Sequence, residues 1–180
     1  MRPFLLAVIC ALSSFAQPYT ISTISGIDRS ANGLQATFDR FGYITGVAVD
    51  QAGNLYFDDW AGRRVYRIGP GGIVTLVAGS GAPTSDPSPN GVPATSVPIN
   101  DPEGVAADSQ RNVYILQPNL HQIQKVSADG LITTFAGASP GSSDDGIPAT
   151  SANLAQCYSI AADASGNVFL NDGPRLRKVD

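Results

Sequence analysis

The stretch Gly46–Phe57, G-V-A-V-D-Q-A-G-N-L-Y-F, occurs three times in this chain in related form. The later copies are Gly104–Ile115 (G-V-A-A-D-S-Q-R-N-V-Y-I) and Ser159–Leu170 (S-I-A-A-D-A-S-G-N-V-F-L). Each copy has a small apolar run that stops at an Asp, a short turn that ends in Asn, and then a hydrophobic segment. A repeated unit of this kind cannot bury its hydrophobic face alone, so the copies are expected to stack on one another.

The spacing of the copies and the segments that follow them predict a four-stranded unit. In the first repeat, the predicted strands are Gly46–Val49, Leu55–Phe57, Arg64–Ile68 and Ile73–Ala78. Apolar and polar residues alternate in the third of these segments, which is typical of a half-buried strand. The Asp residues that end the first strand recur at intervals of 58 and 55 residues. Four short strands at this period, without sustained helical periodicity, indicate the blade of a β-propeller.

An Asp and a Gly-Asn pair mark the turn between the first two strands. Asp50 ends the first strand, and Gly53-Asn54 follows it. Asp and Asn side chains can satisfy the backbone groups of a turn, and Gly or Asn tolerates a positive φ. Arg111 stands at the position of Gly53 and Gly166, so the second turn is expected to differ slightly or to be strained.

A long connector precedes each copy, at residues 27–45, 80–103 and 138–158. All three contain a related motif at the same distance before the first strand: Asn32–Thr37, Asn90–Thr95 and Asp145–Thr150. An apolar residue stands at a fixed place in each: Phe41, Ile99 and Leu154. This constancy predicts ordered connectors that are held to the blades. The variable tips, Ser80–Pro89 and Ala138–Asp144, are rich in Gly, Ser and Pro and are expected to be exposed.

Composition and charge restrict the class of protein. The chain has 180 residues, a length that suits one domain, with 43% hydrophobic and 14% charged residues. It is therefore apolar enough for a packed core and too low in charge for a disordered chain. The net charge is −4 and the basic residues are scattered, so no basic stripe is present to neutralise phosphates. Nucleic acid is not expected as a partner.

The first 16 residues are predicted to be a secretory signal peptide. Arg2 supplies a positive charge, and Phe4–Leu12 is an unbroken apolar run. Ser14 and Ala16 are small residues at the positions that signal peptidase reads, which favours cleavage before Gln17. The alternative is a buried N-terminal strand or helix. The mature protein, residues 17–180, is expected to be secreted, either extracellular or periplasmic, with no segment that spans a membrane.

Few residues are suited to metal or nucleophilic chemistry. Cys10 would leave with the signal peptide, and Cys157 alone can form neither a disulfide framework nor a multi-cysteine metal site. His121 is the only histidine, and no nucleophile motif accompanies any serine. Cys157 is expected to be a small buried residue, and His121 a polar residue at a strand end. No catalytic residue, metal or cofactor is predicted.

The motif G-V-A-V-D-x-x-G-N-L-Y, followed by an R/H-x-I/V-x-K/R-V strand, resembles the NHL repeat. The segments that match this later strand are Arg64–Ile68, Gln122–Val126 and Arg175–Val179. The connector motif G-x-P-A-T-S is similar to that of secreted bacterial NHL proteins with long connectors. The resemblance covers nearly all of Tyr19–Asp180 and implies an all-β propeller of four-stranded blades, an architecture that hosts many unrelated functions.

The chain is predicted to form an incomplete propeller arc, with two complete blades and one partial blade. The blades are placed at about 46–79, 104–137 and 159–180. Tyr19–Gly26 resembles the fourth strands Gly72–Gly79 and Gly130–Gly137, so it would close the final blade of a ring. Closed propellers have about four to eight blades, and three would make too tight a ring. The chain is therefore expected to be the N-terminal part of a longer protein, or a degenerate remnant, with an unpaired edge that invites aggregation.

The copies stop agreeing just after the second strand, where a binding face made of loops is expected. Asp59 and Asp172 match the Asp that NHL repeats carry here, whereas Gln117 departs from it. Trp60 would stack on a sugar or anchor a partner if exposed, or fill the space between blades if buried. The acidic pairs lack the spacing of a Ca²⁺ loop, so solvated turns are favoured. The predicted binding residues are Asp58, Asp59, Trp60, Gln117, Asn119, Asn171 and Asp172.

Two functions are compatible with these features. The first is a secreted, non-enzymatic binding or scaffold module that presents propeller loops to a protein or glycan partner. The second is the N-terminal fragment of a propeller-type lyase or hydrolase whose catalytic residues lie in missing blades. The lack of a catalytic set favours the first.

Overall fold

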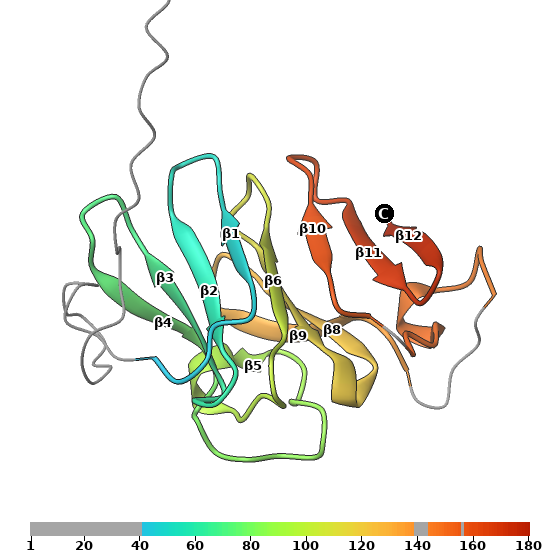
Figure 1. Ribbon diagram of the computed structural model, residues 1–180, viewed down its shortest axis with the longest axis horizontal. Coiled ribbons are helices and arrows are strands. Elements are labelled where there is room, and N and C mark those ends of the chain that lie inside the picture. Colours follow the sequence, from blue (N-terminus) through green and yellow to red (C-terminus); the bar gives the residue numbers. More distant parts are fainter. Residues whose placement is uncertain (1–40, 139–143, 156) are drawn as a thin grey trace, which may run out of the picture.

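The computed structural model describes residues 41–138, 144–155 and 157–180, which form three antiparallel sheets side by side in an arc (Figure 1). The predicted signal peptide, the strand predicted at Tyr19–Gly26 and the Asn32–Thr37 motif lie outside the described residues. These three assignments therefore stay predictions.

Each sheet is one blade, with its strands in chain order. Blade 1 consists of β1 (Val47–Val49), β2 (Leu55–Asp59), β3 (Arg64–Ile68) and β4 (Val74–Ala78). Blade 2 consists of β6 (Gly104–Ala107), β7 (Val113–Gln117), β8 (Gln122–Val126) and β9 (Leu131–Ala136), with the short β5 (Val92–Pro93) added beyond β9. Blade 3 consists of β10 (Ile160–Ala162), β11 (Val168–Asp172) and β12 (Arg175–Val179). The predicted fold class, an incomplete β-propeller arc, is confirmed.

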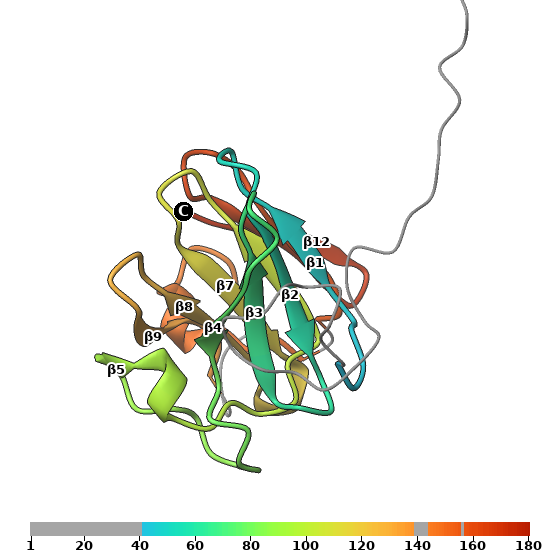
Figure 2. The same cartoon turned by 90° about the vertical axis from the view of Figure 1, so that its left-hand side faces the viewer.

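The first strands of the blades, β1, β6 and β10, lie next to one another, and the other strands run outward from them (Figures 1 and 2). Small residues permit this close approach. A Cβ added to Gly46 would lie only 2.8 Å from the Cα of Gly104. The small apolar run that opens each repeat is therefore a packing requirement of the inner strands.

Two apolar cores hold the blades together, as the stacking of repeats requires. The first joins Tyr56, Val65 and Ala78 of blade 1 to a larger set on blade 2 and its connector: Ile99, Val105, Val113, Ile115, Val126 and Ile132. The second joins Tyr114 and Ile123 of blade 2 to a set on blade 3 and its connector: Leu154, Cys157, Val168 and Leu170. Blade 2 thus uses one face against blade 1 and the other face against blade 3.

A hydrogen-bond network centred on an Asp shapes the inner hairpin of blade 2. Asp108 Oδ1 accepts hydrogen bonds from the backbone N–H groups of Gln110 and Asn112. Its Oδ2 accepts hydrogen bonds from Asn112 Nδ2 and the Tyr114 hydroxyl. One side chain therefore satisfies both the turn and the first residues of the next strand, which explains why Asp, Asn and an aromatic residue recur together.

The other two hairpins repeat this arrangement. Asp50 and Asp163 accept hydrogen bonds from the equivalent amides and Asn side chains, and Asp50 also accepts one from Tyr56. Phe169 takes the tyrosine position in blade 3 and has no hydroxyl to donate. Burial alone would raise the pKa of Asp50, but the hydrogen bonds outweigh it and hold the pKa below its ordinary value. Burial beside this carboxylate raises the pKa of Tyr56 to about 12.

The turn that contains Arg111 keeps the shape of the other two. Arg111 has a φ of +66°, compared with +78° for Gly53 and +86° for Gly166. Its N–H donates to the carbonyl of Asp108, and the two glycines donate to the equivalent Asp carbonyls. The predicted strain is therefore present, because a left-handed conformation costs a residue with a side chain about 1–2 kcal/mol.

The second and third connectors are held to the blades, as predicted from their constant spacing, and most of the first lies outside the described residues. Ile99 and Leu154 are 0% and 2% exposed. In the second connector, Gly79 N–H donates to Ala94 O at the start of the short 3₁₀ turn η2 (Ala94–Ser96). The third connector has the equivalent turn η4 (Ala149–Ser151). These contacts place the second and third connectors against the outer strands of blades 1 and 2.

Candidate functional site

The predicted binding residues lie where the second strand of each blade ends, at the end of the blades opposite the Asp hairpins (Figure 1). Trp60 follows β2, and Asn119 lies in the 3₁₀ turn η3 (Pro118–Leu120) after β7. The sequence predicts loops for the other five, but they are strand residues: Asp58, Asp59, Gln117, Asn171 and Asp172. The predicted loop placement is wrong because the pairing of each hairpin continues to the last of these residues, as in the pair Asp59↔Arg64.

Three of these strand residues occupy equivalent positions and are buried: Asp59, Gln117 and Asp172 are 4%, 0% and 4% exposed. Asp59 Oδ1 accepts hydrogen bonds from three backbone N–H groups of the adjoining loops: Gly42, Tyr43 and Gly62. Asp172 Oδ2 lies 2.6 Å from a guanidinium nitrogen of Arg175 and 3.3 Å from one of Arg177. Asp59 and Asp172 therefore fix the loops and strand ends of the predicted binding face through buried contacts and are not themselves accessible to a ligand.

Gln117 is the centre of a buried polar network in blade 2. Its Oε1 accepts a hydrogen bond from Asn100 N–H at 2.8 Å, and its Nε2 donates to Gln124 Oε1 at 2.5 Å. The Ser88 hydroxyl also reaches Gln124 Oε1, at 3.4 Å, and Ser88 is only 5% exposed. The expected exposure of the Ser80–Pro89 tip is therefore wrong at Ser88. Gln117 fixes the second connector against the blade.

Asp58 and Asn171 hold the backbone that leads into an inner strand. Asp58 Oδ1 accepts hydrogen bonds from Thr45 N–H at 2.7 Å, the Thr45 hydroxyl at 2.9 Å and Gly46 N–H at 3.0 Å. Asn171 Oδ1 accepts hydrogen bonds from the two equivalent N–H groups of blade 3: Tyr158 and Ser159. In both blades, one side-chain oxygen accepts the two backbone N–H groups before the inner strand. The accepting residue is a carboxylate in blade 1 and a neutral amide in blade 3.

The Asp58 carboxylate is satisfied on one side only. The residue is 0% exposed, and within the described part of the chain its Oδ2 has no hydrogen-bond partner. A Cβ added to Gly46 would lie 3.0 Å from this oxygen, so backbone surrounds it closely. Burial raises the pKa of Asp58 against the effect of the hydrogen bonds to Oδ1, and the charge of Asp59 acts in the same direction as burial.

Asp58→Asn is expected to stabilise the protein at neutral pH and to change its pH dependence. Since the folded-state pKa of Asp58 is raised, the native chain keeps this proton at a pH where the unfolded chain releases it. The contribution of Asp58 to stability is therefore complete below about pH 4 and is lost as the pH rises through the raised pKa. Asn keeps the accepting oxygen without the charge, so urea unfolding at pH 7 should show a gain of about 1 kcal/mol that is absent at acidic pH.

The reciprocal change, Asn171→Asp, is the control for this effect. It places a carboxylate at the equivalent but less buried position, so it should lower stability at pH 7 by a smaller amount. If Asp58→Asn left the slope of unfolding free energy against pH unchanged, Asp58 would not carry the raised pKa.

Trp60 lines a shallow pocket of about 260 Å³ together with Tyr43, Thr45 and Glu103. Trp60 is 39% exposed and Tyr43 is 67% exposed. The N–H of Trp60 donates to Tyr43 O at 2.8 Å, which joins the two segments that carry these rings. Of the two alternatives for Trp60, the exposed one is correct, so its ring is accessible to a ligand.

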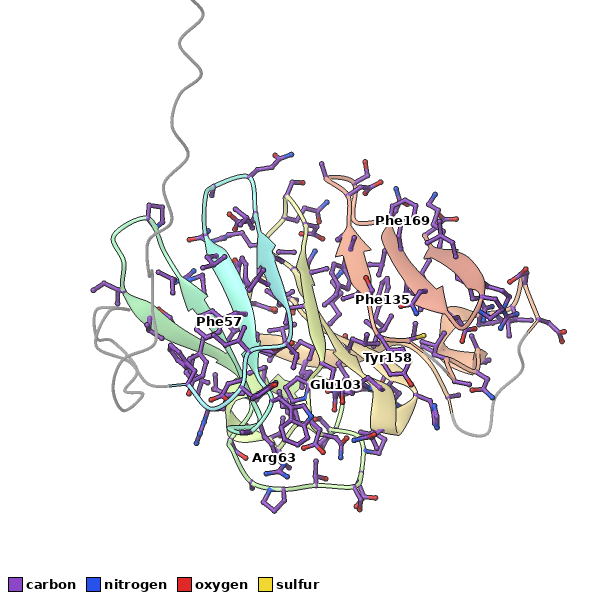
Figure 3. All side chains as sticks on the ribbon, viewed as in Figure 1. Phe57, Arg63, Glu103, Phe135, Tyr158 and Phe169 are labelled. Carbon is purple, nitrogen blue, oxygen red and sulfur yellow. The ribbon has the colours of Figure 1, made fainter. Side chains whose placement is uncertain are left out.

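Glu103 adds a carboxylate to this pocket, and its side chain makes no hydrogen bond with any described residue. Thr45, Glu103 and Tyr158 occupy equivalent positions just before β1, β6 and β10. Tyr158 is 66% exposed, and Figure 3 shows it with Glu103 beside the starts of the inner strands. The sequence pattern does not predict Tyr43 or Glu103 as site residues. Glu103 could have been found because the residue before each inner strand differs among otherwise similar copies.

Asn119 belongs to a polar bridge between blades 1 and 2 near this pocket. Arg63 Nε lies 3.1 Å from Asp101 Oδ1, an ion pair whose angle does not meet hydrogen-bond geometry. Asn119 Nδ2 donates to Asp101 Oδ2 at 3.4 Å. The bridge joins the loops after β2 and β7 through the connector that carries Glu103.

His121 and Cys157 occupy structural positions. His121 has a φ of +54°, and its Nδ1 lies 3.3 Å from Leu154 O. Cys157 is 1% exposed in the core between blades 2 and 3. Across residues 41–138, 144–155 and 157–180, no three His, Cys, Asp or Glu side chains are grouped so that they could hold a metal ion. In the same residues, no helix has the length and apolar character that crossing a membrane requires.

No family model and no curated protein matches this chain. Solved structures of propeller-like proteins from Bacteroides thetaiotaomicron VPI-5482 are similar to it. A structural genomics protein of unknown function has 26% identity and a TM-score of 0.58, with 70% of this chain and 32% of that chain covered. A putative phosphatase has 16% identity and a TM-score of 0.59, with 81% and 36% covered.

A third similar structure from this organism is an auxiliary nutrient binding protein. It has 18% identity and a TM-score of 0.51, with 80% of this chain and 49% of that chain covered. The chain therefore spans about a third to a half of the length of these three proteins. The likeness supports the propeller fold for the described blades.

Proposed function

We propose that this chain is an NHL-type β-propeller that acts as a secreted, non-enzymatic binding module, with a glycan at the Trp60 pocket. The observation that carries the proposal is the exposed Trp60 ring beside the Glu103 carboxylate, which accepts no hydrogen bond from the residues that the structure describes. An aromatic ring stacks on the apolar face of a sugar, and a carboxylate accepts strong hydrogen bonds from its hydroxyl groups. The pocket of about 260 Å³ is smaller than a typical drug-sized site of roughly 300–1,000 Å³, which suits one sugar unit of a longer glycan.

The buried carboxylates predicted as binding residues support this pocket from behind. Asp59 holds the backbone of Tyr43, and Asp58 holds the backbone and hydroxyl of Thr45. Both carboxylates belong to β2, so two pocket-lining segments are fixed to a rigid strand before a ligand arrives. Asp58 and Asp59 are positioning residues in this proposal, and Trp60, Tyr43 and Glu103 are the residues that touch the ligand.

The enzymatic alternative, a lyase or hydrolase completed by further blades, remains the second candidate from the sequence. The similar structures include a nutrient binding protein and a putative phosphatase, so the fold is compatible with both roles. The Thr45 hydroxyl of the Trp60 pocket donates to the buried Asp58 carboxylate and has no base of the pocket as its acceptor, whereas the aromatic and acidic pair suits recognition. The binding role is therefore the one we propose.

The domain assignment is proposed in the same way. Residues 1–16 are assigned as a signal peptide, and residues 17–180 as a propeller arc exported to the cell exterior or periplasm. The G-V-A-V-D motif and the third-strand pattern support the NHL type. The mass of the secreted product and its N-terminal sequence test these assignments, and a product that retains Met1 would contradict the signal peptide.

Trp60→Ala is expected to weaken glycan binding at least tenfold, because the loss of one stacked ring removes about 1.4 kcal/mol or more. The full chain would first be screened on a glycan array, with the fluorescence of Trp60, the only Trp, as a second readout. Affinities of the variants would then be measured by calorimetry. Ile73→Ala is the matched control, since Ile73 is 38% exposed but lies in the β3–β4 hairpin. Full binding by Trp60→Ala, or no glycan bound by the folded wild-type chain, would contradict the proposal.

A further inference from the structure

A cavity of about 320 Å³ lies between blades 1 and 2, at the end of the blades that carries the Asp hairpins. Its walls come from strands of blade 1, from the second connector and from two hairpins of blade 2. Both blades have all four of their strands, so a full sheet bounds the cavity on each side. The Trp60 pocket lies at the opposite end of the blades, and the two sites share no residue.

Two arginines from different blades line this cavity: Arg67 of β3 and Arg111 of the inner hairpin of blade 2. Arg67 Nε is buried and has no hydrogen-bond partner among the described residues. Neither guanidinium forms an ion pair with a carboxylate in the part of the chain that the structure describes. A buried donor without an acceptor is costly, and more so when it carries charge. The cavity therefore presents two positive charges and a buried N–H group that lacks an acceptor.

Arg67 is positioned by the buried Tyr56. The two residues are opposite each other in the pairing of β2 with β3, and the guanidinium lies beside the Tyr56 hydroxyl. Burial and the charge of Asp50 raise the pKa of Tyr56, and Arg67 acts in the opposite direction. The Tyr56 hydroxyl donates to Asp50, whose other hydrogen bonds come from its own hairpin. One side of the guanidinium is thus fixed, and its Nε still lacks an acceptor.

Arg111 stands where the other two copies have glycine. It adopts the left-handed conformation that Gly53 and Gly166 adopt freely, at the cost described above. A Cβ added to Gly166 would lie 3.6 Å from the Tyr114 hydroxyl, so a side chain at this turn approaches the tyrosine of the preceding blade. Arg111 correspondingly lines the cavity together with Tyr56. The strained turn therefore places a positive charge at the cavity.

The equivalent space between blades 2 and 3 contains an aromatic ring. Phe135 packs edge-on against Tyr114 there, with ring centroids 4.8 Å apart. Val77 is the equivalent of Phe135 in blade 1, and it is much smaller. The Tyr114 hydroxyl also reaches Gly166 O of the following blade at 3.4 Å, whereas Tyr56 makes no such bond to blade 2 within the described residues. The smaller residue leaves the space between blades 1 and 2 open.

The charge and the apolar surface of the cavity restrict the kind of ligand. Arg67 and Arg111 are positive and Asp129 is negative, so the charged residues that line it sum to +1. The Ser127 hydroxyl donates to Asp129 and lowers its pKa, which keeps this carboxylate ionised at neutral pH. A site with this balance favours a singly charged anion over a doubly charged one. The apolar part of the wall consists of Val77, Pro93, Val113 and Val126.

We propose that this cavity binds a small organic carboxylate, with the carboxylate on Arg67 and Arg111 and an apolar body against Val77 and Val113. The planar fork of a guanidinium matches the two oxygens of a carboxylate and forms strong, charge-assisted hydrogen bonds with them. The volume lies near the lower limit of ligand pockets, roughly 300–1,000 Å³, which suits a body of about one ring. This site goes beyond glycan binding at Trp60 and does not depend on it.

Titration of the full ¹⁵N-labelled chain with acetate, benzoate and octanoate, followed by NMR, tests the proposal. Benzoate or octanoate should bind saturably and more tightly than acetate, because only these two reach the apolar wall. The largest shifts should fall on the amides of Arg111 and Asp129, far from the Trp60 pocket. Benzamide has the body of benzoate without its charge and should bind at least tenfold more weakly. Phenyl phosphate, which is doubly charged, should also bind more weakly than benzoate.

Four variants separate the site from the stability of the fold. Arg67→Gln and Arg111→Gly should each weaken benzoate binding at least tenfold. Arg111→Gly also relieves the strained turn, so its Tm should rise while binding is lost. Val77→Phe copies Phe135 and should abolish binding without a change of charge. Lys125→Gln is the matched control, since Lys125 is the equivalent of Arg67 but does not line the cavity, and it should bind as the wild type does.

Four results would overturn the proposal. The first is a folded wild-type chain that binds none of the three carboxylates saturably, and the second is shifts confined to the Trp60 pocket. The third is benzamide or phenyl phosphate that binds as tightly as benzoate. The fourth is full benzoate binding by both Arg67→Gln and Arg111→Gly.

Discussion

Asp108→Ala is expected to lower the free energy of unfolding by about 3–5 kcal/mol, measured by urea denaturation followed by circular dichroism. The Asp108 carboxylate is 2% exposed and accepts hydrogen bonds from Gln110, Asn112 and Tyr114. Alanine leaves these donors without their acceptor, and a hydrogen bond to a charged group contributes about 1.5–3 kcal/mol. Since blade 2 packs against both other blades, the loss should appear in the unfolding of the whole arc.

Tyr114→Phe is the matched control for this network. It removes one donor and keeps the carboxylate, so the expected loss is about 1 kcal/mol. Phe169 already stands at the equivalent position of blade 3. Equal losses for Tyr114→Phe and Asp108→Ala would show that the carboxylate is not the centre of the hairpin.

Gly137→Ala is expected to cost about 3 kcal/mol or more, which corresponds to a fall in Tm of roughly 6–12 °C. Gly137 has a φ of +97°, and a Cβ there would lie 2.0 Å from His121 O and 2.7 Å from Gln122 Cα. Both contacts are with backbone, so no side-chain rotation can relieve them. The backbone must move at the point where β9 passes the start of β8. Differential scanning calorimetry measures the shift.

Gly130→Ala separates this clash from the cost of the backbone conformation. Gly130 has a φ of +83°, but a Cβ added there meets nothing within 4 Å. The expected loss is about 1 kcal/mol, or roughly 2–4 °C in Tm. If both variants lost the same amount, the contact with His121 would contribute nothing.

The blades could be predicted because the same pattern of strand and turn residues recurs in three copies. The Asp and Asn of the inner hairpin were identifiable as turn residues from their recurrence, and the structure shows the hydrogen bonds that impose them. The strain at Arg111 was predictable for the same reason, because one residue departs from a pattern whose backbone conformation is known. The strand ends were not predictable. Asp58 and Asp59 are charged residues typical of loops, yet inside β2 they bind backbone N–H groups.

The candidate site could be predicted only in part. Trp60 stood out as the only Trp, but its exposure depends on how the connector that carries Tyr43 crosses it. Tyr43 and Glu103 lie in connectors, where the copies share spacing but not residue types, so no recurring pattern marked them. The sequence marks Gln117 only by its departure from the Asp of the other copies. That departure serves a buried network with Asn100, which a one-dimensional pattern does not reveal.

The pairing of each strand with the next one along the chain also affects how the protein folds. Blade 1 closes between Val47 and Ala78, and the main strands of blade 2 close between Gly104 and Ala136. Contacts between residues so near in sequence give a low contact order within each blade, which speeds folding. A blade can therefore form while the rest of the chain is still being synthesised, and its apolar face stays exposed until the next blade has folded against it.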